Sequence, residues 1–136
     1  MYESEIIKQV QNINQKEAGK WIVEGTGFPM PNYILMAGVP VINSTNTYPD
    51  MEKWHLLDTK ETQEEVYNRY AHINVNLVEE ENRQEKFKLI QPDLFEVNLT
   101  KKDLETLEVK YIFTIHELEG FEKIYENYSY KIFKVN

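Results

Sequence analysis

The sequence of 136 residues contains no cysteine. Disulfide bonds, thiolate catalysis and zinc sites built on cysteine are therefore excluded. This absence leaves the cellular compartment open, because domains without disulfides work on both sides of membranes. Signatures of catalysis and nucleotide binding are also missing. The sequence has no GxSxG, Walker A or GxGxxG motif, and Gly25-Thr26-Gly27 indicates only a turn after a strand.

Long apolar runs are scarce as well. The longest covers residues 33–42 and is interrupted by Gly38 and Pro40, whereas a membrane-spanning helix needs about 20 apolar residues. The first residues are polar and acidic, so no signal peptide is expected. The chain itself is therefore expected to be soluble.

Basic residues are fewer than acidic residues. The chain has 15 Lys and Arg residues against 23 Asp and Glu residues, which gives a formal net charge of −8. The densest basic pair, Lys101-Lys102, is followed by Asp103 and Glu105. Such a surface repels polyanions, so nucleic acid is not an expected partner. The same repulsion disfavours docking on an anionic lipid surface.

The composition that remains is that of one globular domain. Hydrophobic residues make up 41% and charged residues 28% of the chain, which suits a folded protein rather than a disordered one. The length suits one core. A single α/β domain over residues 1–136 is therefore expected.

Apolar periodicity and capping residues predict the secondary structure. Helices are predicted at 4–13, 32–37, 51–57, 62–71, 100–107 and 118–126. Strands are predicted at 21–23, 39–42, 72–78, 87–90, 94–99, 109–115 and 128–135. Asp50 is placed to cap the third helix, and Thr62 with Glu65 has the spacing of a capping box.

Helices alternate with buried strands at both ends of the chain. This order predicts an α/β fold, namely a three-layer sandwich with a mixed, mostly parallel sheet and an inserted β-hairpin over 73–90. The segment 109–115 is almost continuously apolar, as in a central strand covered on both faces. We expect it beside the strand 21–23.

Polar residues are concentrated in the segment YNRYAH, which begins at Tyr67. On the predicted helix, Tyr67 and Tyr70 face inward, and Asn68, Arg69 and His72 share the opposite face. Two interpretations of this face stay open. Arg69 can pair with a glutamate four residues earlier, as surface side chains often do. Alternatively, the guanidinium, amide and imidazole form a platform for a phosphate, a carboxylate or a sugar.

The loop over 43–50 and the helix that follows add further candidates for sugar recognition. They are Asn43, Asn46, Tyr48, Trp54 and Asp58. An aromatic ring can cover the apolar face of a pyranose while amides bind its hydroxyl groups. The alternative is a capped turn in which Trp54 anchors the core.

The three histidines do not indicate a metal site. His55, His72 and His116 lack HxxxH or HxH spacing, so neither a metal nor a cofactor is expected. The acidic run Glu79–Glu81 is interpreted as solvated charge rather than as a glycosidase pair.

The order of these motifs resembles a known family. The motifs are Trp21–Val23, Pro31–Val39, Asn43–Pro49, Trp54 with Asp58, Tyr67–His72, Leu104–Phe113, Phe121–Tyr125 and Tyr130–Phe133. Together they resemble the soluble C-terminal, extracytoplasmic domain of bacterial multi-pass membrane proteins of the GT-C glycosyltransferase or YfhO-like type. In GT-C proteins the catalytic acid generally lies in a loop between transmembrane helices, and this chain has no such helices.

The resemblance implies a non-catalytic accessory domain, one piece of a larger membrane protein, at the extracytoplasmic face of the bacterial cell membrane. Its expected partners are the membrane-embedded portion of the parent protein and a polysaccharide or lipid-linked sugar. The alternative is a stand-alone cytoplasmic enzyme or binding domain that holds an anionic small molecule with Arg69 and His72, near Asp58. A purely structural or interaction module is the third possibility.

Overall fold

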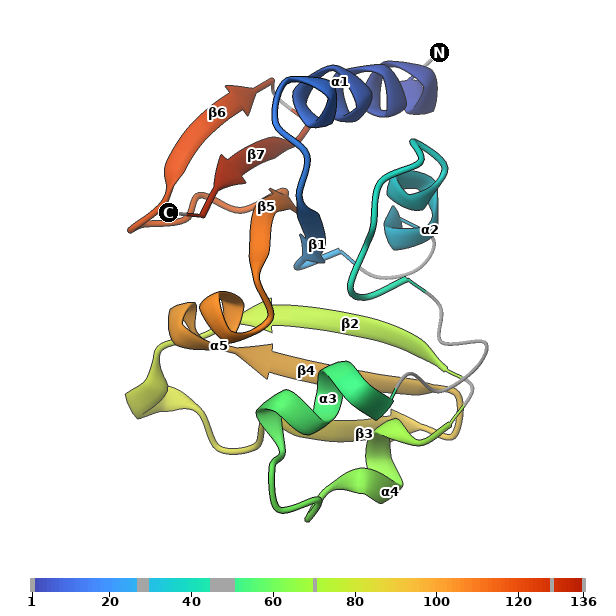
Figure 1. Cartoon of the computed structure of the whole chain (residues 1–136), viewed down its shortest axis with the longest axis vertical. Coiled ribbons are helices and arrows are strands. Elements are labelled where there is room, and N and C mark those ends of the chain that lie inside the picture. Colours follow the sequence, from blue (N-terminus) through green and yellow to red (C-terminus); the bar gives the residue numbers. More distant parts are fainter. Residues whose placement is uncertain (1, 27–29, 45–50, 70, 128, 136) are drawn as a thin grey trace.

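The computed structural model describes residues 2–26, 30–44, 51–69, 71–127 and 129–135 (Figure 1). Its helices are α1 (Tyr2–Lys16), α2 (Met30–Leu35), α3 (Met51–Leu57), α4 (Glu64–Tyr67), the 3-10 helix η1 (Glu80–Asn82) and α5 (Lys101–Thr106). Its strands are β1 (Lys20–Glu24), β2 (His72–Leu77), β3 (Phe87–Gln91), β4 (Leu94–Leu99), β5 (Val109–Thr114), β6 (Glu122–Glu126) and β7 (Lys131–Lys134).

The described strands form one seven-stranded sheet in the order β3-β4-β2-β1-β5-β7-β6. β1 pairs in parallel with β2 and β5, and β2 pairs in parallel with β4. The pairs β3–β4, β5–β7 and β6–β7 are antiparallel. The predicted α/β class with a mixed sheet is confirmed, and the prediction of a mostly parallel sheet is wrong.

The sheet is covered on both faces, because the side chains of β1 alternate between two cores. Trp21 and Val23 pack with Ile6 of α1 and Ile34 of α2. Ile22 belongs to the other cluster, which contains residues of α3, α4 and α5. Figure 1 shows α1 and α2 close to β1, and α3 close to β3 and β4. The sandwich therefore has three layers, as predicted.

β5 is a central strand, as its apolar sequence predicts. It lies between β1 and β7, and every residue but Lys110 is buried. The ring of Phe113 is fully buried and stacks on Tyr130, with ring centroids 4.9 Å apart. The predicted neighbour of this strand, 21–23, is part of β1 and pairs with it in parallel.

Several local predictions are wrong. The hairpin is formed by β3 and β4 around Pro92 and Asp93 rather than over 73–90, because β2 pairs with β4 in parallel. The segment 118–126 forms a loop and then strand β6, because Gly120 has a φ of 86° and the following residues pair with β7. The helix predicted for 62–71 is only α4, because His72 already pairs in β2 with β4.

Two capping predictions have different outcomes. The side chain of Thr62 does not cap α4, whose N-cap residue is Gln63. A capping box forms instead at α5, where Thr100 and Asp103 exchange hydrogen bonds. The predicted cap Asp50 lies outside the described residues.

The strand predicted at 39–42 is reduced to a bridge between Val41 and Trp21.

Candidate functional site

Three of the four parallel strands, the neighbours β2, β1 and β5, finish at one edge of the sheet. β1 ends at Glu24, β2 at Leu77 and β5 at Thr114, and all three run in the same direction. In open α/β sheets, ligands bind in the crevice beyond the carboxyl ends of such strands. A ligand-binding site is therefore expected at this edge.

Glu24 holds the strand ends together. Its side chain is buried, and its Oε1 accepts hydrogen bonds from Thr114 Oγ1 at 2.7 Å and His116 Nδ1 at 3.0 Å. Its Oε2 accepts a hydrogen bond from the backbone N–H of Leu77 at 3.1 Å. Both carboxylate oxygens are thus satisfied, as burial of a carboxylate requires. The Glu24 carboxylate is a structural joint between β1, β2 and β5.

His116 covers this joint from the solvent side. The His116 side chain is 54% exposed, whereas that of Glu24 is 6% exposed. Gly25 makes the close approach possible, since a Cβ at that position would lie 2.3 Å from His116 Cε1. Gly25 also has a φ of 73°, which favours glycine. The imidazole is therefore held by both its hydrogen bond and its packing.

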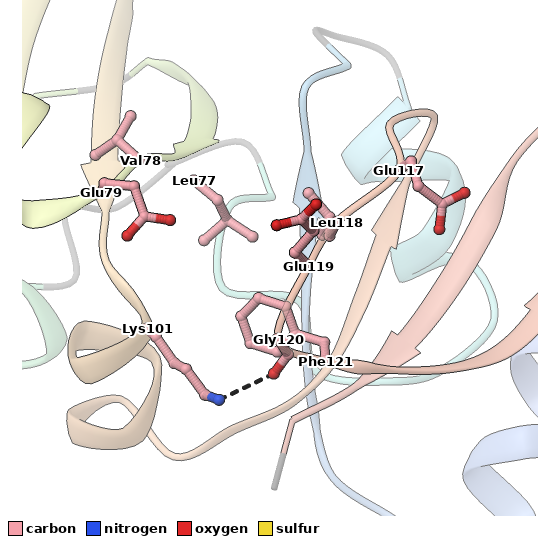
Figure 2. Close-up of a pocket in the computed structure, with 9 residues that line it drawn as sticks. All are labelled: Leu77, Val78, Glu79, Lys101, Glu117, Leu118, Glu119, Gly120 and Phe121. Carbon is pink, nitrogen blue, oxygen red and sulfur yellow. Dashed lines mark hydrogen bonds between the residues drawn. The ribbon is translucent and has the colours of Figure 1, made fainter.

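A pocket of about 580 Å³ opens beside the joint (Figure 2). Its lining comes from the end of β2 and the residues after it, from the first residue of α5, and from the segment that follows β5. These residues are Leu77, Val78, Glu79, Lys101, Glu117, Leu118, Glu119, Gly120 and Phe121. The volume lies within the range of about 300–1,000 Å³ that is typical of small-molecule sites.

The charged side chains of this pocket are not equivalent. Lys101 Nζ donates to the carbonyl oxygen of Gly120 at 2.9 Å and lies 5.3 Å from the ring centroid of Phe121 (Figure 2). Glu117 pairs with the Nζ of Lys123, at 2.8 Å. By contrast, the carboxylates of Glu79 and Glu119 have no partner among the described residues. The pocket is thus acidic, with an aromatic ring and two leucines in its wall.

Two residues proposed from the sequence are built into the core. Asn43 lies inside the sheet, where its Nδ2 donates to Val23 O at 2.8 Å and its Oδ1 accepts from Val23 N at 3.0 Å. Trp54 is fully buried and makes edge-to-face contacts with Phe87 and Phe95. Trp54 is therefore a core anchor, which was the alternative to sugar contact.

Asp58 organises the turn between α3 and α4. Its carboxylate accepts hydrogen bonds from the backbone N–H groups of Thr62 and Gln63, from the Thr62 hydroxyl and from the Tyr67 hydroxyl. Burial alone raises the pKa of Asp58, but these hydrogen bonds outweigh it and leave the pKa below its ordinary value. Burial, reinforced by the Asp58 carboxylate, raises the pKa of the Tyr67 hydroxyl.

The polar residues of YNRYAH do not share a helix face. Asn68 is exposed beyond the end of α4, and His72 begins β2, where its N–H donates to Asp93 O at 2.8 Å. Arg69 donates to the carbonyl oxygens of Val66 at 2.8 Å, Glu65 at 2.7 Å and Pro92 at 3.1 Å. The guanidinium thus ties α4 to the turn between β3 and β4. Asn46 and Tyr48, the remaining candidates, lie outside the described residues.

The carboxyl edge is not among the sites predicted from the sequence, although the sequence contains a signal for it. Glu24 and His116 each follow a buried segment that was predicted as a strand, and these two strands were predicted to be neighbours. Carboxyl ends of neighbouring parallel strands meet at one edge. Applying this rule would have brought Glu24 and His116 together.

No helix in the described ranges has the length and apolar character needed to cross a membrane. No curated protein and no solved structure matches the chain significantly. One family model does match, over residues 1–136, and its description is a domain of unknown function, DUF7654. The chain therefore belongs to the DUF7654 family.

Proposed function

We propose that this DUF7654 domain is a non-catalytic accessory domain that binds a neutral or amino-bearing saccharide in the pocket at the carboxyl edge. We further propose that it is part of a larger, glycosyltransferase-like membrane protein and faces the extracytoplasmic side. The resemblance of the motifs supports the membrane setting. The observation that carries the saccharide proposal is the pocket itself, whose lining combines unpaired carboxylates with an aromatic ring.

The lining suits a polyhydroxylated ligand. The ring of Phe121 can cover an apolar sugar face, and the carboxylates of Glu79 and Glu119 can accept hydrogen bonds from hydroxyl or ammonium groups. Glu117 is paired with Lys123, and the remaining two glutamates against Lys101 make the pocket unfavourable for phosphate. A lipid-linked sugar would therefore bind through its sugar and not through its pyrophosphate.

The way in which the buried carboxylate of Glu24 is used supports the proposal of a non-catalytic role. A general acid or base must reach the proton that it transfers. Both oxygens of Glu24 instead hold strand ends and His116 in place. The alternative of an anionic ligand at Arg69 has less support, because the Arg69 guanidinium donates to three backbone carbonyl oxygens.

Calorimetric titration tests the proposal. Chitotriose and cellotriose serve as amino-sugar-derived and neutral probes, and glucose 1-phosphate serves as the anionic probe. We expect at least one trisaccharide to bind more tightly than the phosphate, and Glu119→Gln to weaken that binding. Glu81→Gln is the matched control, since Glu81 is exposed and lies outside the pocket. Tighter binding of glucose 1-phosphate, or equal binding by both variants, would contradict the proposal.

A further inference from the structure

A second group of polar side chains converges around the turn between α3 and α4. His55 lies in the last turn of α3, Glu61 in the turn that follows, and Glu64 in the first turn of α4. His55 Nε2 lies 3.0 Å from Glu64 Oε2 and 3.6 Å from Glu61 Oε1. One ligand atom from each residue falls within 4.8 Å of the others.

We propose that His55, Glu61 and Glu64 bind a divalent transition-metal ion such as Zn²⁺. Imidazole nitrogen and carboxylate oxygen are both ligands of zinc, with bonds of about 2.0–2.2 Å. Around a tetrahedral ion, such bonds place neighbouring ligand atoms about 3.3–3.6 Å apart. The distance from His55 Nε2 to Glu61 Oε1, 3.6 Å, matches this spacing, and the distance to Glu64 Oε2, 3.0 Å, is slightly shorter, so binding requires only small side-chain rotations.

The surrounding turn holds the ligands in place before an ion arrives. Asp58, between the ligands in sequence, fixes the turn through its bonds to Thr62, Gln63 and Tyr67. Glu61 is held by its N–H, which donates to Asp58 O at 2.9 Å. The Tyr67 ring meets the His55 ring edge to face, with centroids 5.9 Å apart, and orients the imidazole. Supports of this kind around the ligands normally raise metal affinity.

The group is also open to solvent. The side chains of His55, Glu61 and Glu64 are 33%, 56% and 39% exposed. An ion can therefore enter directly and keep water at its remaining coordination positions, as in an open three-ligand zinc site. Three protein ligands are enough for a bound ion but leave it exchangeable. This inference is independent of saccharide binding at the carboxyl edge.

A protonated imidazole between two glutamates would have the same geometry, so the test must distinguish a proton from a metal ion. Zn²⁺ is titrated into the whole chain by calorimetry, and Co²⁺ by absorbance, since bound Co²⁺ gives visible bands that report its ligands. We expect one ion per chain. His55→Ala and Glu61→Gln should each weaken binding by about tenfold or more.

Glu65→Gln is the matched control, because Glu65 is exposed, adjacent to Glu64 and outside the group. It should bind Zn²⁺ as the unaltered chain does. Circular dichroism confirms that each variant is folded, and loss of the Co²⁺ bands in folded His55→Ala supports the proposal. The absence of stoichiometric binding by the unaltered chain would overturn it. Equal binding by the unaltered chain and by His55→Ala would overturn it as well.

Discussion

The 43–72 region and the carboxyl-edge pocket both contain carboxylates and a cationic side chain, but their hydrogen-bonding groups are used differently. In the first region, Asn43, Asp58 and Arg69 direct their polar atoms at neighbouring backbone and side-chain groups. At the carboxyl edge, the carboxylates of Glu79 and Glu119 have no partner among the described residues. Residue type alone therefore does not identify a binding site. The relevant property is whether a polar group still has hydrogen-bonding capacity in the fold.

The largest expected effect on the free energy of unfolding comes from a substitution in the sheet, which supports both regions. Phe113→Asp places a carboxylate where the ring is fully buried between β1 and β7. The cost is several kcal/mol, comparable with the whole stability of a small domain, about 5–15 kcal/mol. Chemical denaturation followed by circular dichroism should find the variant unfolded or nearly so. An unchanged unfolding midpoint would show that β5 is not interior.

The next largest effect is expected at Asp58. Asp58→Ala removes the acceptor for two backbone N–H groups and for the Tyr67 hydroxyl, which is buried. Each buried group left unpaired costs about 1–3 kcal/mol. We expect the free energy of unfolding to fall by about 3 kcal/mol, measured by urea denaturation. A loss below about 0.5 kcal/mol would mean that the Asp58 carboxylate is available for other contacts, as in a binding site.

The same residue makes the stability depend on pH. The pKa of Asp58 is lower in the folded chain than its ordinary value of 3.8. Its contribution is therefore present above about pH 4, and is lost as the pH falls through the folded-state pKa. Urea midpoints measured between pH 7 and pH 3 should fall more steeply in the unaltered chain than in Asp58→Ala. Parallel curves would contradict this role.

Substitution of Arg69 is expected to have a smaller effect on the free energy of unfolding. Arg69→Ala removes hydrogen bonds to three backbone carbonyl oxygens, and two of these bonds are exposed to solvent. Exposed carbonyl groups can bind water instead, so we expect a loss of about 1 kcal/mol in the free energy of unfolding. Saccharide binding should not change. Arg69→Lys is the matched variant, because it keeps the charge but not the planar set of donors. If both folded variants lost saccharide binding, the binding site would lie in the 43–72 region and not at the carboxyl edge.

The smallest effect on stability is expected in the pocket. Glu79→Gln and Glu119→Gln alter exposed side chains, so the free energy of unfolding should change by no more than about 0.5 kcal/mol. Thermal melts compare both variants with the unaltered chain. Saccharide affinity should nevertheless fall in both. A clear destabilisation would show that these carboxylates hold the fold together and are not available to a ligand.

The sequence predicts the fold better than it predicts the site, for a physical reason. The strand 109–115 and its neighbour 21–23 are recognisable because burial on both faces of the sheet requires apolar residues at nearly every position. The loop before β6 and the short α4 are not, because long-range pairing with β7 and β4 overrides local helix patterns. The role of Arg69 depends on Pro92, which is distant in sequence and close only in the fold. The role of Asn43 likewise could not be predicted from neighbouring residues, since its hydrogen-bond partner Val23 lies 20 positions away.

The most direct test of the central claim is to map a saccharide titration onto the two regions. Backbone amide signals of the isotopically labelled chain are followed by NMR while chitotriose or cellotriose is added. We predict that the shifts concentrate at Lys101 and in the segment 117–121, with those of Asn68, Arg69 and His72 unchanged. Shifts confined to 68–72, or none in either region at saturating trisaccharide, would contradict the assignment of the site to the carboxyl edge.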